Sequence, residues 1–210
     1  MLRIVIADDH PIVLEGLKEI LSDSFDDVII DGTVTGYDLI SHVQKNPYDL
    51  VILDISLPDI NGLEVLKEVK KIKPKLAVLI VSMYPEEQYA SRALKAGAQG
   101  YLTKRSASSE LVLAVRKILS GKRYVSPAFA EKMLFDFESD AERPLHERLS
   151  DRELQVFRMI GGGKALNQIA EEIHLSVNTV RTYRTRILEK IGVKGTSELI
   201  HYAITHSLTE

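Results

Sequence analysis

The chain has 210 residues, of which 45% are hydrophobic and 27% charged, and its formal net charge is −3. This is the composition of a globular protein with one large or two modest domains and a buried core. The lack of cysteine excludes disulfides, thiolate zinc sites and cysteine nucleophiles. No apolar run reaches the roughly 20 residues that span a bilayer, and MLRIVIADDH has no signal-peptide layout, so we expect a cytoplasmic protein.

The first 120 residues alternate strand-like and helix-like patterns. Strands rich in Val, Ile and Leu are expected at about 2–7, 28–32, 50–54, 77–82 and 100–103. Their continuous apolar character is typical of parallel strands buried on both faces. Helices are expected at about 11–22, 36–45, 62–72, 86–96 and 107–120. Five such units predict an α/β domain over 1–122, a flavodoxin-like, doubly wound, five-stranded parallel sheet.

The pattern changes after about residue 121. SPAFAEKMLFDF predicts one more helix, and the polar, proline-containing ESDAERPLHER follows it, so we expect a linker with a helix over 123–148. A small all-α domain is expected over 149–210. It opens on a capping box, Ser150 with Glu153. Its helices are expected at about 151–160, 166–173, 177–190 and 196–206.

Polar side chains stand at the C-terminal ends of four predicted strands. Asp8 and Asp9 follow the first strand and Asp54 ends the third, while Ser82 and Lys104 end the fourth and fifth. Such ends meet in the crevice where parallel sheets bind ligands. Converging carboxylates favour Mg²⁺, and a lysine beside them suits a phosphoryl group that one carboxylate could accept. Each aspartate alone could equally be a solvated loop residue or a helix cap, but the full set favours a site.

The first 120 residues resemble, over their full length, the receiver domain of two-component response regulators. The resemblance rests on the Asp8–Asp9 pair, LVILDISLPDINGLE around Asp54, the SMY after the fourth strand, and GYLTK. The run DDHPIVLEGL is similar to the NarL/FixJ subgroup in particular. The resemblance implies that Asp54 accepts a phosphoryl group from a phosphohistidine of a sensor kinase or from a small acyl phosphate.

The same resemblance implies roles for the neighbouring residues. The implied Mg²⁺ ligands are Asp9, Asp54 and the backbone carbonyl of Ser56, with Asp8 acting through water. The implied phosphoryl contacts are Ser82 and Lys104, and the aromatic switch that moves inward is Tyr101. Two features are left open. Arg105 stands where many receivers have proline, which leaves the isomer of the preceding peptide bond undecided, and Tyr84 either slows autodephosphorylation or contacts a partner.

The segment NQIAEEIHLSVNTVRTYRTRILEKIG predicts a helix-turn-helix. After the break at His174–Leu175, Ser176 caps a second helix with one apolar stripe. Its other side presents Asn178, Arg181, Thr182, Thr185 and Arg186. A helix of about 14 residues is roughly 20 Å long, enough to lie in a major groove, where Arg can donate two hydrogen bonds to guanine. The alternative is an ordinary amphipathic helix with a solvated charged face.

Residues 149–206 resemble the LuxR-type DNA-binding domain. The matching motifs are the LSxRE opening, GK.LNQIA, LSVNTV and the RILEKIGV tail. The resemblance implies base-edge contacts for Arg181, Thr182 and Thr185, and phosphate contacts for Asn178, Thr179 and Arg186. Arg184 lies beside the apolar stripe, where its stem could pack.

These patterns predict a DNA-binding response regulator, not an enzyme, in which Mg²⁺-dependent phosphorylation of Asp54 switches dimerisation, DNA binding and transcription. Its expected partners are double-stranded DNA, a sensor histidine kinase and a second copy of the chain, with RNA polymerase as a candidate contact and no membrane. Three alternatives stay open. They are a phosphorylation-independent regulator whose receiver is a dimerisation platform, a phosphatase or phosphotransferase acting on a small molecule, and a protein-interaction module without DNA.

Overall fold

The structure is a computed structural model that describes residues 1–138, 144–206, 208 and 209. Residues 139–143, in the middle of the predicted linker, lie outside the described residues, as do 207 and 210. The chain forms two compact units, Met1–Ser139 and Asp140–Glu210. Each unit buries its own set of apolar side chains and therefore has its own core.

A five-stranded parallel sheet forms the centre of the N-terminal unit, with the strand order β2–β1–β3–β4–β5. The strands are β1 (Leu2–Ala7), β2 (Val28–Thr33), β3 (Leu50–Leu53), β4 (Ala77–Ser82) and β5 (Gly100–Thr103). In the register of the sheet, Ile4 pairs with both Ile30 and Leu50. The predicted topology is confirmed. Strand β3 is buried throughout, whereas β2 is only partly buried because it lies at an edge of the sheet.

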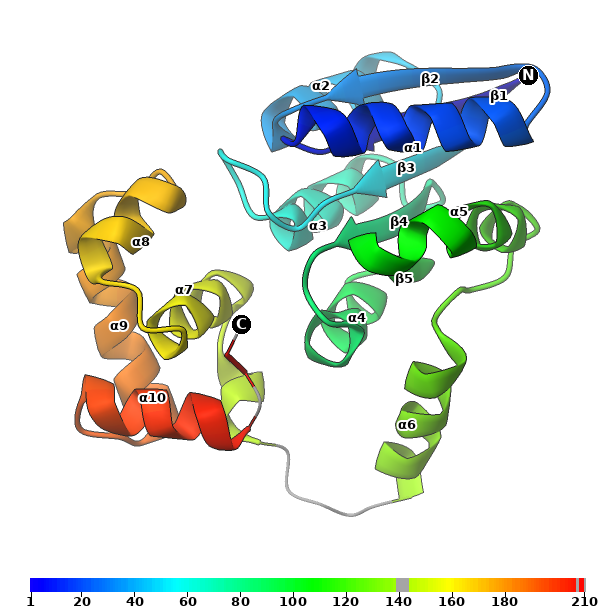
Figure 1. Ribbon diagram of the computed structural model, residues 1–210. Helices are drawn as coiled ribbons and strands as arrows, with labels where there is room; N and C mark the ends of the chain where they lie inside the picture. The colour runs from blue at the N-terminus through cyan, green and yellow to red at the C-terminus, as the bar shows by residue number, and fades with distance from the viewer. Residues whose placement is uncertain (139–143, 207, 210) are drawn as a thin grey trace. The chain divides into compact units, whose positions relative to one another are not determined.

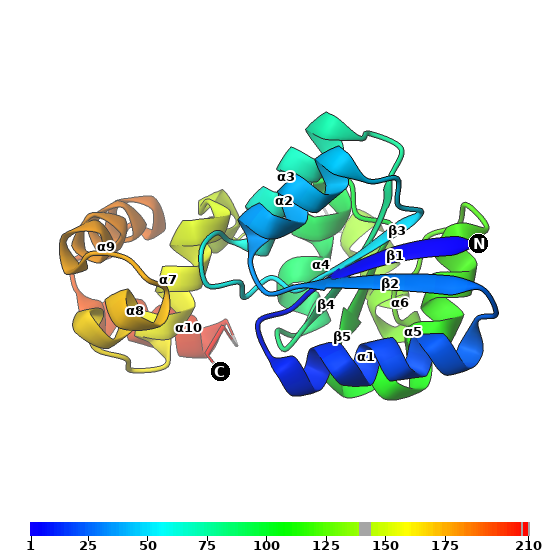
Figure 2. The same ribbon diagram turned by 90° about the horizontal axis from the view of Figure 1, so that it is seen from above.

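Helices cover both faces of this sheet. They are α1 (Pro11–Ser24), α2 (Gly36–Lys45), α3 (Gly62–Ile72), α4 (Glu86–Lys95) and α5 (Lys104–Leu119). Helix α1 packs against α5 on one face, while α3 packs between α2 and α4 on the other (Figures 1 and 2). Helix α5 begins three residues earlier than predicted, because the side chain of Thr103 accepts a hydrogen bond from the Ser106 N–H (3.3 Å) and caps the helix there.

The chain returns to the sheet after α5. The N–H of Tyr124 donates to the Gln99 carbonyl (2.9 Å), and the N–H of Tyr101 donates to the Tyr124 carbonyl (3.1 Å). This segment thus lies parallel to β5 along its free edge. Gly100 permits the close approach, because a Cβ atom there would lie 2.8 Å from the Tyr124 oxygen.

The helix predicted within the linker is α6 (Pro127–Glu138). The Ser126 hydroxyl caps it by accepting a hydrogen bond from the Phe129 N–H (3.1 Å). The Ser126 N–H in turn donates to the Glu86 carboxylate at the start of α4 (2.9 Å). The hydrogen bond from Ser126 to Glu86 therefore joins the start of α6 to α4 in the N-terminal unit.

The C-terminal unit is all-α. It contains the 3₁₀-helix η1 (Leu145–Arg148) and the helices α7 (Asp151–Gly161), α8 (Leu166–Glu172), α9 (Val177–Ile191) and α10 (Thr196–Thr205). The capping box is confirmed, since the Glu153 N–H donates to Ser150 Oγ (3.3 Å) and the Ser150 N–H donates to Glu153 Oε2 (2.7 Å). Helix η1 was not predicted, because one short 3₁₀ turn has no amphipathic period.

Helices α8 and α9 pack together, and α7 packs against both α9 and α10. The turn between α8 and α9 is tight, because His174 adopts a left-handed φ of 52° and the Leu175 N–H donates to the Ala170 carbonyl (2.8 Å). The side chains of Phe157, Val180 and Leu199 are buried in the core of this unit. No helix in the part of the chain that the structure describes is long and apolar enough to cross a bilayer.

Candidate functional site

The ends of three parallel strands bring two distant carboxylates and one ammonium together. Asp8 follows β1 and Asp54 follows the neighbouring β3, where the Asp54 N–H donates to the Ala7 carbonyl (2.9 Å). Lys104, directly after β5, places Nζ 2.7 Å from Asp8 Oδ2 and 2.7 Å from Asp54 Oδ2. The sheet order explains this convergence, because the C-terminal ends of parallel strands lie on one edge.

The side chains of this group are almost completely buried, with exposed fractions of 1% for Asp8 and 2% for Asp54. Two carboxylates about 4 Å apart repel by roughly 4 kcal/mol at an effective dielectric constant of 20, so a cation between them is strongly stabilising. Burial alone lowers the pKa of Lys104, but the adjacent charges of Asp54 and Asp8 outweigh burial and raise it. Lys104 is therefore a fixed positive charge at neutral pH.

Asp9 completes the acidic cluster, by which we mean Asp8, Asp9 and Asp54. Asp9 Oδ1 is buried but receives no well-directed hydrogen bond from the described residues. Carboxylate atoms of the three aspartates lie within 4.8 Å of one another and of a nitrogen of His10. Oxygen ligands of this kind suit a hard divalent cation, and the unsatisfied Asp9 oxygen fits such an ion. The residues present are therefore compatible with Mg²⁺.

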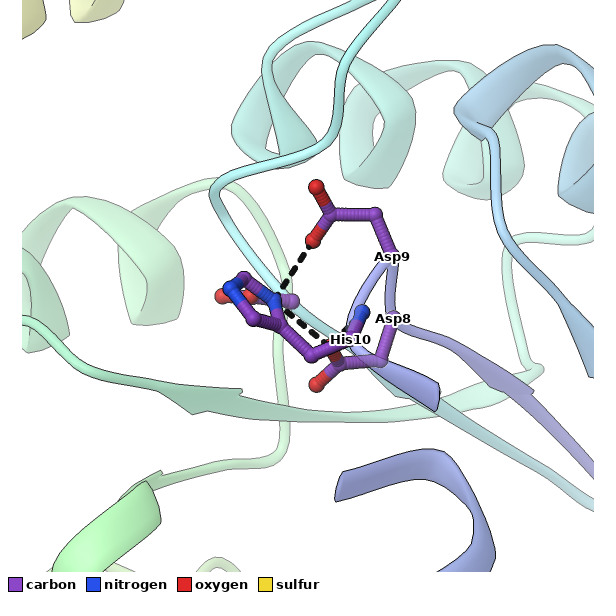
Figure 3. Close-up of side chains that lie close together, drawn as sticks. Asp8, Asp9 and His10 are labelled. Carbon is purple, nitrogen blue, oxygen red and sulfur yellow. Dashed lines mark hydrogen bonds and ion pairs between the residues drawn. The ribbon is translucent and has the colours of Figure 1, made fainter. Parts of the chain in front are cut away.

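His10 is a member of this group that sequence reasoning missed. Figure 3 shows its imidazole between the side chains of Asp8 and Asp9. Nδ1 lies 2.8 Å from Asp9 Oδ1 and 3.3 Å from Asp8 Oδ1. The sequence signal was its position directly after two aspartates at a strand end, but the direction of the ring depends on the turn into α1.

The loop after β3 approaches the acidic cluster through its backbone. The Ser56 N–H donates to Asp54 Oδ1 (3.3 Å), so the backbone of Ser56 lies beside the carboxylate. Helix α3 begins directly behind this loop. A Cβ atom on Gly62 would lie 2.1 Å from the Asp54 carbonyl oxygen, so only glycine permits this approach.

The predicted switch residues lie on β4 and β5. Ser82 is fully buried at the end of β4, beside the strand that carries Asp54. Tyr101 is fully buried as well, and its hydroxyl donates to the Tyr84 carbonyl (2.9 Å). The Tyr101 ring is thus already inside the domain. The Tyr84 ring is half-buried and stacks on Tyr89 with a centroid distance of 4.7 Å.

The connection from β5 to α5 resolves the question of the bond before Arg105. None of the peptide bonds in the described residues is cis, so the Lys104–Arg105 bond is trans.

A second candidate site is the recognition face of α9, formed by side chains that are exposed together. These residues are Asn178, Arg181, Thr182, Thr185 and Arg186. Thr179, at the start of the helix, is half-buried, and its hydroxyl lies 2.8 Å from Ser176 Oγ. The opposite stripe, with Val180, Ile187 and Ile191, is buried. The face therefore combines guanidinium, hydroxyl and amide groups on a helix that its other side fixes in the core.

Two nearby cations are used within the unit. Arg184 is half-buried and its Nε donates to Thr196 Oγ1 at the start of α10 (2.9 Å). Lys190 lies 2.5 Å from the buried Glu153 carboxylate of α7. Burial raises the pKa of Glu153, but the bonds from Lys190 and Ser150 lower it more, so the pKa is lowered overall. Arg184 and Lys190 thus hold α9 in the bundle.

Comparisons with known proteins match each of the two units to a known family. The family described as "Response regulator receiver domain" matches residues 4–116, and "Bacterial regulatory proteins, luxR family" matches residues 147–203. The chain is 34% identical over 209 residues to the response regulator UvrY of Escherichia coli, covering 99% of this chain and 96% of UvrY. It is 34% identical over 212 residues to the response regulator GacA of Pseudomonas protegens, covering 100% and 99%.

Solved structures of response regulators are also similar to this chain. RcsB from Salmonella enterica serovar Typhimurium, bound to promoter P1flhDC in the presence of phosphomimetic BeF3⁻, has a TM-score of 0.60 at 25% identity and covers 96% of this chain and 97% of RcsB. A LuxR-family two-component response regulator from Aurantimonas sp. has a TM-score of 0.60 at 30% identity and covers 65% and 98%. The chain therefore belongs to the NarL/FixJ family of response regulators, the DNA-binding proteins of two-component systems that regulate transcription.

Proposed function

We propose that this protein is a transcription regulator switched by Mg²⁺-dependent phosphorylation of Asp54. The donor is a phosphohistidine on a sensor histidine kinase or a small acyl phosphate. One observation carries the proposal: Lys104 Nζ lies 2.7 Å from the buried carboxylates of both Asp54 and Asp8. Asp9 Oδ1, in the same cluster, receives no well-directed hydrogen bond from the described residues. Residues 1–122 would be the receiver, 123–148 the linker and 149–210 the DNA-binding domain.

Each residue of the site has its own role in the transfer of the phosphoryl group. A carboxylate oxygen of Asp54 attacks phosphorus, the new P–O bond forms as the P–N bond of the phosphohistidine breaks, and the imidazole leaves. Mg²⁺, held by Asp9, Asp54 and the Ser56 carbonyl with Asp8 acting through water, would supply positive charge for the phosphoryl oxygens. Lys104 supplies a second, fixed positive charge at the same place. The protein acts here as the acceptor of the phosphoryl group and not as an enzyme with turnover on a free substrate.

The phosphoryl signal would act through β4 and β5. Ser82 would donate its hydroxyl to a phosphoryl oxygen, and phosphorylation would favour the inward position of the switch residue Tyr101, in which its hydroxyl donates to the Tyr84 carbonyl. Shifting such a two-state equilibrium from 1:99 to 99:1 takes about 5.5 kcal/mol of differential stabilisation. Charge-assisted hydrogen bonds to a phosphoryl group are among the few local changes of that size.

The output would be DNA binding by α9. Arg181, Thr182 and Thr185 would face base edges in the major groove, and Asn178, Thr179 and Arg186 would contact phosphates. Phosphorylation would favour a homodimer, which suits half-sites about one helical turn apart. RcsB, which was solved on a promoter together with a phosphomimetic, supports this coupling. RNA polymerase is a further candidate partner, and the DNA partner implies a cytoplasmic location.

The test uses the full chain and Asp54→Asn, each treated with acetyl phosphate with and without Mg²⁺. We expect intact-mass spectra to show one added phosphoryl group on the wild type with Mg²⁺ and none on Asp54→Asn. DNA selected by the phosphorylated protein should then bind the phosphorylated wild type about 5- to 150-fold more tightly than the variant, the usual range of such coupling. Equal DNA affinities would contradict the switch and support the phosphorylation-independent alternative.

A further inference from the structure

His10 stands next to the acidic cluster in a restrained backbone position. It is the last residue before α1 and precedes Pro11, which confines it to extended backbone, and its φ is −97° and ψ 106°. Its N–H donates to Asp8 Oδ1 (2.9 Å), which fixes the turn from the other side. The turn thus holds the imidazole at the same strand edge as the carboxylates.

The imidazole has no role in capping α1. A side chain at this position usually accepts a hydrogen bond from the first turn of the helix, and among the described residues His10 forms no such bond. Nδ1 instead lies 2.8 Å from Asp9 Oδ1, an oxygen that is buried without a well-directed hydrogen bond. The same nitrogen also forms a hydrogen-bond contact with Asp8 Oδ1 (3.3 Å), so it faces an oxygen of each of two aspartates, as ligands of one cation would.

The wider set of donor atoms fits a single ion. One nitrogen of His10 and one oxygen each of Asp8, Asp9 and Asp54 all lie within 4.8 Å of one another. Ligands on opposite sides of an ion with bonds of about 2.1 Å are about 4.2 Å apart, so small side-chain rotations would close the set. Lys104 engages Oδ2 of both Asp8 and Asp54. Oδ1 of Asp8 accepts from the His10 N–H and Oδ1 of Asp54 from the Ser56 N–H, and each of these oxygens has a further lone pair for an ion or for its water.

We propose that His10 is a nitrogen ligand of the divalent ion in the acidic cluster, and that it makes the cluster prefer transition-metal ions, Mn²⁺ among them, over Mg²⁺. Mg²⁺ takes oxygen ligands and retains water, whereas imidazole is a ligand of transition metals. The inference rests on the proposed metal site but not on phosphorylation of Asp54. The competing role for the same contact is a simple ion pair between His10 and Asp9.

Measurements of ion affinity distinguish a metal-ligand role of His10 from a simple ion pair with Asp9. Free Mn²⁺ is counted by its EPR signal during titration of the full chain, and Mg²⁺ affinity is obtained by competition. We expect His10→Ala to weaken Mn²⁺ binding about 10-fold while Mg²⁺ affinity stays within about twofold, the usual scale for loss of one ordered group at a metal site. His206→Ala, which removes an exposed histidine of the other unit, is the matched control and should change neither affinity.

Pulsed EPR of bound Mn²⁺ gives a readout that a structural role would not produce. Modulation from a coordinated imidazole nitrogen should be present in the wild type, change with ¹⁵N-histidine, and vanish in His10→Ala and in His10→Gln, which keeps a polar side chain. Absence of that modulation in the wild type, its persistence in the variants, or equal weakening of both ions would overturn the proposal. Circular dichroism checks that both variants are folded.

The same samples distinguish this inference from the proposed function. Each is also treated with acetyl phosphate and Mg²⁺ and weighed by mass spectrometry. Nitrogen modulation without a phosphoryl group on Asp54 would contradict the proposed function alone. Phosphorylation of Asp54 without nitrogen modulation would contradict the role of His10 alone.

Discussion

Lys104 holds two buried carboxylates that would otherwise repel each other, and its own pKa is raised as a result. A raised lysine pKa adds stability that is complete below the unfolded value of about 10.4 and is lost only as pH rises through the folded value. Lys104 therefore keeps its charge across the physiological range. If the rate of phosphoryl transfer to Asp54 changes between pH 6 and 8, the group that titrates should be one other than Lys104.

Tyr84 is the residue that we predict sets the lifetime of the phosphoryl group. Its ring is half-buried and stacked on Tyr89, two residues after Ser82. We expect Tyr84→Ala to shorten the phosphoryl half-life, because a bulky ring there would hinder the hydrolytic water, and Tyr84→Phe to preserve it. The decay of the phosphorylated mass is the measurement. An unchanged half-life in Tyr84→Ala would favour a role in partner contact.

Two arginines of α9 should have distinguishable effects on DNA binding. Arg181→Ala should cost about 1–3 kcal/mol at the cognate site and relax sequence specificity, because it removes a base contact. Arg186→Ala should weaken binding evenly across sequences and lower the slope of log affinity against log salt by about one, because it removes a phosphate contact. Affinities across a salt series measure both effects. Arg184→Ala is the control and should leave the slope unchanged, since Arg184 bonds Thr196.

Among the elements, α4 and α6 are joined by the buried carboxylate of Glu86. Burial raises its pKa, although the hydrogen bonds from Ser126 lower it in part. The contribution of a carboxyl group with a raised pKa is complete below the unfolded value of about 4.3 and is lost as pH rises through the folded value. At neutral pH the ionised Glu86 therefore costs stability, even though its oxygen accepts the hydrogen bond that fixes α6.

Because the ionised Glu86 costs stability at neutral pH, removal of its charge should have a pH-dependent effect on the free energy of unfolding. Glu86→Gln keeps an acceptor for the Ser126 N–H without the buried charge, so it should be more stable than the wild type at pH 7, with the difference disappearing toward pH 4. Glu86→Ala should lose about 1 kcal/mol relative to Glu86→Gln at either pH, because the hydrogen bond is gone. Urea unfolding from pH 4 to 8 measures this. A Glu86→Gln protein no more stable than the wild type at pH 7 would refute the argument.

Elements with a local signal were predicted well from the sequence. Apolar runs located all five strands, and the caps Ser150 and Ser176 located the starts of α7 and α9 to within a residue. The early start of α5 was missed because two potential caps, Thr103 and Ser106, lie three residues apart. The pairing of Tyr124 with β5 was missed because one extended residue carries no periodic pattern.

In the candidate site, too, some features could be predicted from the sequence and others could not. The approach of Asp8, Asp54 and Lys104 could be predicted because strand ends follow from strand order. The direction of the His10 ring could not, because it depends on a turn fixed by hydrogen bonds to Asp8 and by Pro11. The anchoring of Arg184 by Thr196 depends on helix packing, so the sequence indicated only its position beside the apolar stripe.

The whole molecule carries a net charge of −3 while its recognition face contains two arginines. We expect the receiver to restrain DNA binding until Asp54 is phosphorylated. A fragment of residues 144–210 should then bind the selected DNA more tightly than the unphosphorylated full chain does, as measured by fluorescence anisotropy. The fragment begins at 144 because η1 belongs to this unit, where His146 contacts the Tyr202 ring.

Asp54→Asn is the control for this comparison. The full-length variant should bind as weakly as the unphosphorylated wild type, before and after acetyl phosphate. A fragment that binds no better than the unphosphorylated full chain would rule out restraint by the receiver.

Tyr124 shields the outer side of β5, since its backbone pairs with Gln99 and Tyr101. An uncovered, apolar edge strand is a template for strand addition between molecules. A receiver fragment cut at residue 116, where the receiver family match ends, would lack that cover. Such a fragment should aggregate on concentration, whereas one that continues to residue 138 should remain monodisperse in light scattering.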